Sequence, residues 1–436
     1  MLANTLIILL VLIALSVPVA AVLGVLSLIL ADVYSPMPVT RAIGESFWQY
    51  GSDSILVAIP MFILLGEILL RSGITQRMYD ALAQWLSWLP GGLMHSNIGS
   101  CAMFAATSGS SVATAATVST VALPEIDRRG YNERLFVGTL AAGGTLGILI
   151  PPSINLIIYG LLTDTSVPQL YLAGLVPGII LSSLFMLTVI AGCLWKPEWG
   201  GEPIATSWKK RFGVLPDLLP PMCIFIVVVG SIYAGLATPT EAASLGVIAA
   251  LGLAAYYGTL KVDMLRSAIE GTMTTTAMVM LIILAAIFLN FVLAVTGMTA
   301  LLTGFINGLG LGPYNTLMVI ILFYLILGCF METFSMLITT APLIVPIVAS
   351  LDLGIGDDHT VKIWFGILLT VLLEAALITP PIGVNLYVVQ GVRQRGTMND
   401  VIIGTLPFVA SMFVMIVLIV LYPQIALWLP ELFYPK

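Results

Sequence analysis

Long stretches without a single charged side chain run through this chain of 436 residues. A transmembrane helix needs about 20 apolar residues. Each of the six longest uncharged stretches exceeds that length; they are residues 1–31, 81–124, 135–163, 165–195, 271–331 and 401–430. Asp, Glu, Lys and Arg make up only 9% of the chain, too few to cover the surface of a soluble fold. We therefore predict an all-α polytopic protein in a lipid bilayer, since a β-barrel would show short alternating segments. No basic tail or patch suggests nucleic acid.

Three segments of the first half resemble segments of the second half, in the same order and at an offset in the 220s. The pairs are SVPVAAVLGV (16–25) with ATPTEAASLGV (237–247), LRSGI (70–74) with AVTGM (294–298), and PPSINL (151–156) with PPIGVNL (380–386). Shared order and spacing indicate a duplication. We expect a first repeat at 1–200, a cytoplasmic linker at 201–217 and a second repeat at 218–436.

The loop charges reverse between the two halves. Cytoplasmic loops are enriched in Lys and Arg. Loops 71–80 and 125–134 hold two and three arginines, whereas their counterparts are uncharged or acidic. The loop around Asp164 lacks a base, whereas its counterpart holds Arg393 and Arg395. Equivalent loops then lie on opposite sides, which predicts an inverted-topology repeat of the kind found in secondary transporters.

Two apolar segments begin and end on the same side of the membrane by this charge pattern. They cover about 90–124 and 312–346, near 17 residues per arm. Each arm is long enough to reach well into the bilayer, because a helix rises about 1.5 Å per residue. We predict two re-entrant helical hairpins, with turns at 107–111 and 331–335. A further helix, at 75–89 and 299–311, should precede each hairpin.

Two double prolines should break two other helices, at about 135–163 and 363–391. A double proline removes two N–H donors and clashes with earlier carbonyls. Irregular backbone at membrane depth must be buried or line a wet cavity. The carbonyls freed at Gly147 and Ile150, and at Ala376 and Thr379, could therefore face a cation.

Hydroxyl groups at the hairpin turns could complete the shell around such a cation. Candidates are Ser108, Ser110 and Thr114 in the first half and Thr333, Ser335 and Thr339 in the second. Carbonyl and hydroxyl oxygens suit a hard cation such as sodium. The competing interpretation is helix packing, for which small polar residues are common in membranes. The cluster at 108–111 favours a site because it lies beside Gly109 at a predicted turn.

Other polar groups at the breaks and turns could contact a substrate. The half-helices that begin after each break would point their positive ends at an anion. Among the intramembrane acids Glu67, Glu241, Glu332 and Glu374, we expect Glu332 to be functional, its alternative being to accept from backbone donors at the turn. The side chains that we expect at the substrate are Ser111, Asn155, Glu332, Ser335 and Asn385. For both asparagines, a role in satisfying freed backbone groups is equally open.

The sequence resembles the DctM-type large membrane subunit of tripartite ATP-independent periplasmic (TRAP) transporters along essentially its whole length. The motifs are ATSGSSVAT (106–114), LPEI (123–126), GGTLGILIPPS (143–153), MET (331–333), PLIVP (342–346) and TPPIG (379–383). The resemblance implies sodium-driven import of organic acids by an elevator motion of the hairpin domain. It also implies two partners, a small four-helix membrane subunit and a periplasmic substrate-binding protein, and a location in the bacterial inner membrane.

The resemblance further implies sodium ligands, with no organic cofactor. The first site is expected at Ser108, Ser110, Gly147, Ile150 and Pro152. Repeat symmetry extends the second to Thr333, Ala376, Thr379 and Pro381. The substrate would be a small carboxylate or sulfonate. Alternatives are a proton-coupled or exchanger-type transporter that uses Glu332, and, remotely, an intramembrane enzyme, for which the sequence offers no catalytic motif. Residues 1–31 are either two helices broken near Pro18 or one long tilted helix.

Overall fold

The computed structural model describes the chain except for residues 1, 16, 36, 37, 40–42, 203, 205, 299, 300, 302, 303, 305–307, 309, 330, 382 and 436. The described residues form helices and no strand. Six of these helices are long and apolar enough to cross a membrane, and a bent pair would make a seventh span. The six are α4 (Ser54–Arg71), α11 (Val167–Trp195), α15 (Pro239–Tyr256), α16 (Val262–Val295), α20 (Asp358–Ile378) and α22 (Met398–Leu421). The predicted all-α polytopic class is confirmed.

The described elements run in two series, each with a hairpin followed by a helix that a double proline interrupts. The first series is α1 (Leu2–Ala14), α2 (Val19–Tyr34), α3 (Ile43–Gly51), α4, α5 (Ile74–Leu86), α6 (Leu93–Ser108), α7 (Ser111–Ala122), α8 (Pro124–Arg129), α9 (Glu133–Thr145), α10 (Ile154–Thr163) and α11. A short loop helix, α12 (Trp208–Gly213), follows. The second series is α13 (Leu219–Phe225), a π-helical turn (Ile226–Gly230), α14 (Ser231–Tyr233), α15, α16, α18 (Pro313–Gly328), α19 (Thr333–Ala349), α20, α21 (Val384–Arg393), α22 and α23 (Gln424–Phe433).

The elements with predicted breaks are broken close to the expected positions. The first hairpin is α6 and α7, and the second is α18 and α19. The double prolines separate α9 from α10 and α20 from α21. Residues 2–34 form two helices rather than one long helix, as the repeat suggests. Most of the helix predicted at 299–311, before the second hairpin, lies outside the described residues.

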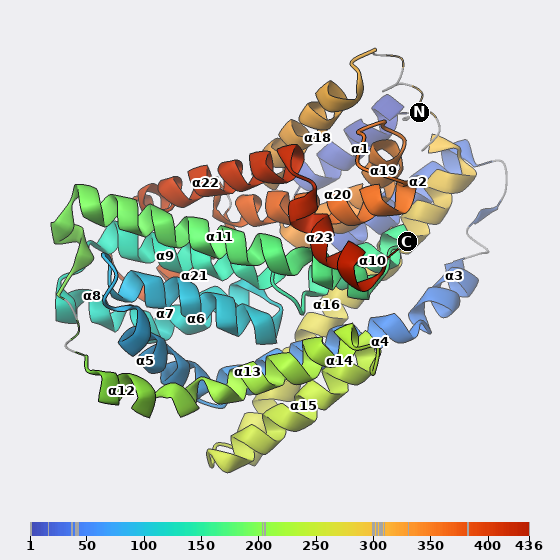
Figure 1. The fold of residues 1–436 in the computed structure, drawn as a ribbon. Coiled ribbons are helices and arrows are strands. Elements are labelled where there is room, and N and C mark those ends of the chain that lie inside the picture. The colour runs from blue at the N-terminus through green and yellow to red at the C-terminus, as the bar shows by residue number, and fades with distance from the viewer. Residues whose placement is uncertain are drawn as a thin grey trace.

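The helices divide into two packed groups. We call α2, α4, α15 and α16 the scaffold helices. In this group α15 packs on α4, α2 packs on α16, and α4 packs on α16. We call α6 to α11 with α18 to α22 the hairpin domain; in it α9 packs on α6, α7 and α22, and α20 on α18, α19 and α22. In Figure 1, α6, α7, α9, α11 and α22 lie roughly side by side.

Glycines allow the two halves of the hairpin domain to approach closely. A Cβ added to Gly138 of α9 would collide with the carbonyl oxygen of Gly404 in α22, and one added to Gly404 would collide with that of Arg134. Small residues at such crossings allow van der Waals contact in the absence of a hydrophobic driving force. This contact between the halves thus depends on a glycine from each.

Ion pairs add to this contact at one end of the domain. Arg393 of α21 bonds to Glu133 of α9 with Nη2 2.8 Å from Oε1, and its side chain is only 2% exposed. Arg395 pairs with Asp127 and lies 3.3 Å from Glu133. Arg134 lies 2.9 Å from Asp400, at the start of α22. Each pair joins a residue of the first half to one of the second.

We predict that Arg393→Met destabilises the protein by about 2 kcal/mol. The change removes the closer partner of Glu133 and leaves only Arg395, at 3.3 Å. Truncating a buried pair costs ~3–5 kcal/mol, and the cost is less here because Glu133 is partly exposed. The matched control is Arg266→Met, which breaks the exposed pair with Glu270 and should cost below ~1 kcal/mol. Thermal unfolding of the purified protein in detergent measures both. Equal melting temperatures for the two variants would contradict the prediction.

Candidate functional site

The tip of the first hairpin is a tight turn rich in hydroxyl groups. Ser108 ends α6, Gly109 adopts a left-handed conformation (φ 61°), and Ser110 caps α7 by accepting from Ala113 N at 3.4 Å. Thr114 Oγ1 donates to the Ser110 carbonyl at 2.6 Å and lies 3.2 Å from Ser108 Oγ. The turn brings three hydroxyls and a carbonyl oxygen within a few ångströms of one another.

This tip fits directly against the first break. A Cβ added to Gly147 would lie 2.7 Å from the backbone N of Ser111, and one added to Gly109 would lie 2.7 Å from the carbonyl oxygen of Pro152. Ser111 Oγ donates to the Thr145 carbonyl at 3.2 Å. Four of the five residues expected at the first sodium site, Ser108, Ser110, Gly147 and Pro152, therefore meet around one junction.

The fifth residue, Ile150, belongs to the same break. Its N–H donates to the Leu146 carbonyl at 3.1 Å. Its side chain packs against α11, where a Cβ on Gly178 would lie 2.6 Å from Ile150 Cγ1. An isoleucine side chain has no oxygen, so Ile150 could contribute only its backbone carbonyl to an ion.

The second hairpin turns slightly earlier than the sequence suggests. The sequence predicts the turn at 331–335, but α18 ends at Gly328 and α19 already begins at Thr333. Glu332 is the cap of α19: its carboxylate accepts from Ser335 N at 3.2 Å, Ser335 Oγ at 3.3 Å and Thr333 Oγ1 at 3.0 Å. The capping role explains why the polar residues that follow Glu332 are helical.

The second tip also lies against its break. A Cβ added to Gly328, at the end of α18, would lie 2.5 Å from the Cβ of Ala376 in α20. Thr379 ends α20 and donates Oγ1 to the Ala375 carbonyl at 2.6 Å. Thr333 begins α19, which packs along α20, and Pro381 lies in the turn after it. The second half thus repeats the arrangement of a hairpin tip beside a double-proline break.

A cavity of about 70 Å³ lies between these tips and the scaffold helices. From the hairpin domain it is lined by Ser108, Ser110, Ala113, Ile154 and Phe334. From the scaffold it is lined by Ile63, Gly66, Glu67 and Leu70 of α4 and by Thr275 and Val279 of α16. Both hairpins and both long scaffold helices therefore contribute to one space, which we call the inner cavity.

Three helices begin at the inner cavity. Ala113 is in the first turn of α7, Ile154 is the first residue of α10, and Phe334 is the second residue of α19. Helix starts carry a partial positive charge that favours an anion; at α19 the capping carboxylate of Glu332 offsets part of it. Beside them lie the hydroxyls of Ser108 and Ser110. The Glu67 carboxylate lines the opposite wall, and no lysine or arginine is among the lining residues.

The two asparagines after the breaks differ in their surroundings. Asn155 follows Ile154 and is buried, and neither amide atom has a partner among the described residues. Asn385 Nδ2 donates to the Ala141 carbonyl at 3.2 Å, and its Oδ1 has no such partner. Asn385 thus joins α21 to α9, as the packing interpretation expects, whereas Asn155 keeps an unused amide beside the inner cavity.

The scaffold contribution to the inner cavity is missing from the sequence predictions. Gly66 lies against the first tip, because a Cβ on it would be 3.2 Å from the Ser108 carbonyl. Glu67 pairs with Arg71, and a Cβ on Gly271 of α16 would lie 2.7 Å from its Oε2. The available signal in the sequence is Glu67, an acid inside an apolar helix. A role at a helix end or between helices would explain this residue equally well.

The geometry agrees with the comparisons to known proteins. The family model of the DctM component of tripartite ATP-independent periplasmic transporters matches residues 6–425. The chain belongs to the DctM family. It is 31% identical to the "C4-dicarboxylate TRAP transporter large permease protein DctM" of Vibrio cholerae, over 95% of this chain and 94% of the relative. It is 29% identical to the "Isethionate TRAP transporter permease protein DctMQ" of Oleidesulfovibrio alaskensis, over 94% of this chain and 64% of the relative.

Membership makes this DctM-family chain a transport protein rather than an enzyme, and a multi-pass protein of the bacterial inner membrane. Its fold also resembles the crystal structure of the Alcanivorax borkumensis YdaH transporter, with a TM-score of 0.63 and 14% identity. The match covers 94% of this chain and 98% of that one. At this identity the likeness concerns the fold alone.

We predict that Gly66→Leu lowers transport at least ~10-fold while lowering the melting temperature by only a few degrees. The added side chain would enter the inner cavity and push the first tip away from α4. Overpacking a close contact costs ~1–3 kcal/mol. Gly24→Leu is the control, because Gly24 also lies on a scaffold helix but has open space around it. Uptake into proteoliposomes and thermal unfolding are measured for both. Normal uptake by Gly66→Leu would refute the role of this contact.

Proposed function

We propose that this chain is the membrane permease of a sodium-coupled, binding-protein-dependent secondary transporter that imports a small organic anion. The supporting observation is the inner cavity, where three helix starts and two serine hydroxyls meet between the hairpin tips and the scaffold. That combination suits a carboxylate or a sulfonate. The names of two relatives specify a C4-dicarboxylate and isethionate, which are a carboxylate and a sulfonate.

The first coupling sodium would bind where the first tip meets its break. The oxygens available there are the hydroxyls of Ser108 and Ser110 and the carbonyls of Gly147, Ile150 and Pro152. The close approach of Gly147 and Gly109 to the opposite backbone supports this assignment, because several backbone oxygens must converge to replace the hydration shell of a sodium ion. Neutral oxygens around a monovalent cation also avoid burying an unpaired carboxylate.

The second sodium would bind at the equivalent place in the other half, with Thr333, Ala376, Thr379 and Pro381 as its ligands. The contact between Gly328 and Ala376 supports the position of this site. Each sodium that enters down a potential of 100 mV supplies about 2.3 kcal/mol. Two sodium ions with a monoanion would therefore drive import electrically as well as chemically.

The inner cavity would change sides by an elevator motion of the hairpin domain along the scaffold helices. The division into two packed groups supports such a motion, since the boundary between them crosses the cavity. Gly66 keeps this boundary close at the first tip. The ion pairs of Arg393 and Arg395 would hold the two halves of the hairpin domain together, so that both tips move as one body.

The partners would be a small four-helix membrane subunit and a periplasmic substrate-binding protein. Membership in a tripartite family supports two further components. A proton-coupled mechanism through Glu332 has less support, because its carboxylate is already engaged by three donors of its own helix. A proton bound to Glu332 would compete with these three donors for the carboxylate, so proton transport through Glu332 would also weaken the cap of α19.

We predict that uptake of a labelled organic anion into proteoliposomes requires a sodium gradient. The purified chain is reconstituted with its two partners, and labelled succinate and isethionate are the probes. Uptake should collapse when potassium replaces sodium outside and should increase with an inside-negative potential. A proton gradient alone should not restore it. Uptake that persists without sodium would contradict the coupling, and uptake without the binding protein would contradict the tripartite assembly.

We predict that Ser110→Ala raises the half-saturating sodium concentration about tenfold. Removal of one oxygen that coordinates a bound ion costs ~1.5 kcal/mol of binding free energy, which is about a tenfold change in affinity. Folding should be preserved, because the Ser110 hydroxyl contributes only a 3.4 Å cap bond. The control is Ser183→Ala on α11, whose exposed hydroxyl bonds to its own helix. An unchanged sodium titration for Ser110→Ala would refute the assignment.

A further inference from the structure

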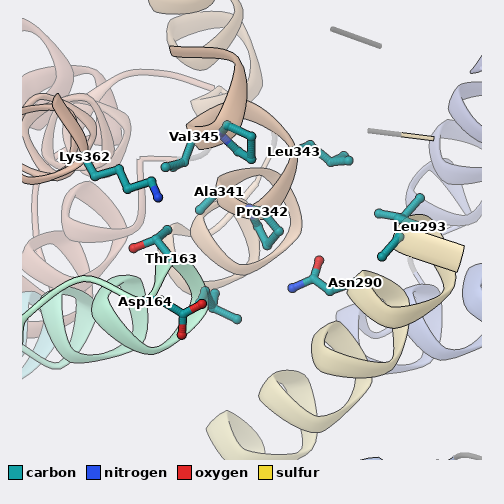
Figure 2. Close-up of a pocket in the computed structure, with 12 residues that line it drawn as sticks. Thr163, Asp164, Asn290, Leu293, Ala341, Pro342, Leu343, Val345 and Lys362 are labelled. Atoms are coloured by element: carbon teal, nitrogen blue, oxygen red, sulfur yellow. The ribbon is translucent and has the colours of Figure 1, made fainter. Parts of the chain in front are cut away.

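A second cavity, of about 300 Å³, lies between α16 and the hairpin domain. Its walls come from the end of α10, from the outer part of α16, from the second half of α19 and from the start of α20. In Figure 2 the side chains of Lys362, Asp164 and Asn290 reach toward this space. We call it the outer cavity. The volume is within the range of small-molecule sites.

The outer cavity lies at the end of the molecule where the described residues include almost no basic ones. The described lysines and arginines other than Lys362 gather at the opposite end, where pairs such as Arg77 with Asp217 and Arg393 with Glu133 are found. The positive-inside rule makes that opposite end cytoplasmic. Lys362 is therefore the only lysine or arginine that the structure describes at the outer end.

The ammonium group of Lys362 is not fully occupied by its ion pair. Nζ lies 2.8 Å from Oδ2 of Asp358, which is 61% exposed. Such a pair contributes little, because water screens the exposed carboxylate. An ammonium group has three donors, so Lys362 can bind a further anion from the cavity side.

Asn290 supplies a second group that packing does not explain. It is the only polar residue among residues 277–295 of α16, and it lines the outer cavity. Its amide makes no hydrogen bond to any residue that the structure describes. A polar side chain in an otherwise apolar stretch of a membrane helix indicates function when it faces a cavity. The amide can donate to a carboxylate or sulfonate held by Lys362.

The outer and inner cavities lie along the same face of α16. Thr275 and Val279 line the inner cavity, and Asn290 and Ala294 line the outer one. With 3.6 residues in each helical turn, these four positions fall within a stripe roughly 100° wide. Between them this stripe contains buried residues such as Ala286. Both cavities thus lie along one face of α16, between the scaffold and the hairpin domain. A packed segment separates one cavity from the other.

We propose that the outer cavity is an uptake subsite for the transported anion, in which Lys362 and Asn290 hold its carboxylate or sulfonate group. This proposal rests on the proposed function, since it adds an outer binding step to the same path. Asp164 also lines the cavity, on the same side as Lys362 in Figure 2, and forms no ion pair with a described residue. A second negative group on the ligand would meet this carboxylate. The cavity therefore suits a small monoanion that also carries a hydroxyl or ammonium donor.

Thiol labelling from the outside tests this subsite without knowledge of the substrate. Ala294→Cys places a reporter thiol on the cavity wall and leaves Asn290 intact, in a background where the four native cysteines are alanine. The probes are two impermeant methanethiosulfonates, one with an anionic sulfonatoethyl group and one with a cationic trimethylammonium group. Both are added to intact cells that expose the periplasmic face. Ser52→Cys, on an exposed turn that does not line the cavity, is the control reporter.

We expect Lys362→Gln to slow the anionic reagent at the reporter thiol of Ala294→Cys about fivefold and not to slow the cationic one, because a local charge acts on the rate of encounter. Lys362→Arg should restore the rate, and the Ser52→Cys reporter should be unaffected by either variant. Absence of labelling in Ala294→Cys, or an anionic rate that ignores Lys362, would overturn the subsite. Charge-dependent labelling without sodium-driven uptake would leave the subsite standing and refute the proposed function instead.

Discussion

Every backbone N–H and C=O group inside a bilayer needs a partner, and the arrangement of this molecule depends on that constraint. A helix can stop at membrane depth only where protein or water receives its free ends. In the described part of the chain, helices are interrupted at two hairpin tips and at two double prolines, and each tip lies against one of the double-proline breaks. The groups that each break releases are thereby concentrated at two junctions.

Close approach at these junctions depends on glycine. Gly147 lies against the Ser110–Ser111 backbone, Gly109 lies against Pro152, and Gly328 lies against Ala376. In each case a side chain would separate a tip from its break. Gly66 has a different role, because it belongs to the scaffold and meets the first tip from outside the hairpin domain. The same residue type thus serves a fixed contact inside the hairpin domain and a contact at its boundary with the scaffold.

The fold and the first tip could be predicted from sequence because their signals are local. Uncharged runs predict membrane helices, a double proline predicts a break, and Gly109 between two serines predicts a turn. The sequence places the start of α19 too late because Glu332, Thr333 and Ser335 together look like a polar turn, whereas Glu332 caps a helix that already contains the others. The scaffold side of the inner cavity could not be predicted, since Thr275 reaches the tips only through tertiary packing.

The two cavities lie far apart along α16. Thr275 lines the inner cavity and Asn290 lines the outer one. They are separated by roughly four helical turns, which corresponds to about 22 Å along the helix axis. On the proposed path, an anion that moved from Asn290 to the helix starts beside Thr275 would travel a distance of this order. The packed segment between them blocks a continuous channel. Lys362 and the three helix starts belong to the same hairpin domain, so a displacement of that domain along α16 would carry them together. In the proposed mechanism the passage of the anion from the outer to the inner cavity is therefore a separate step.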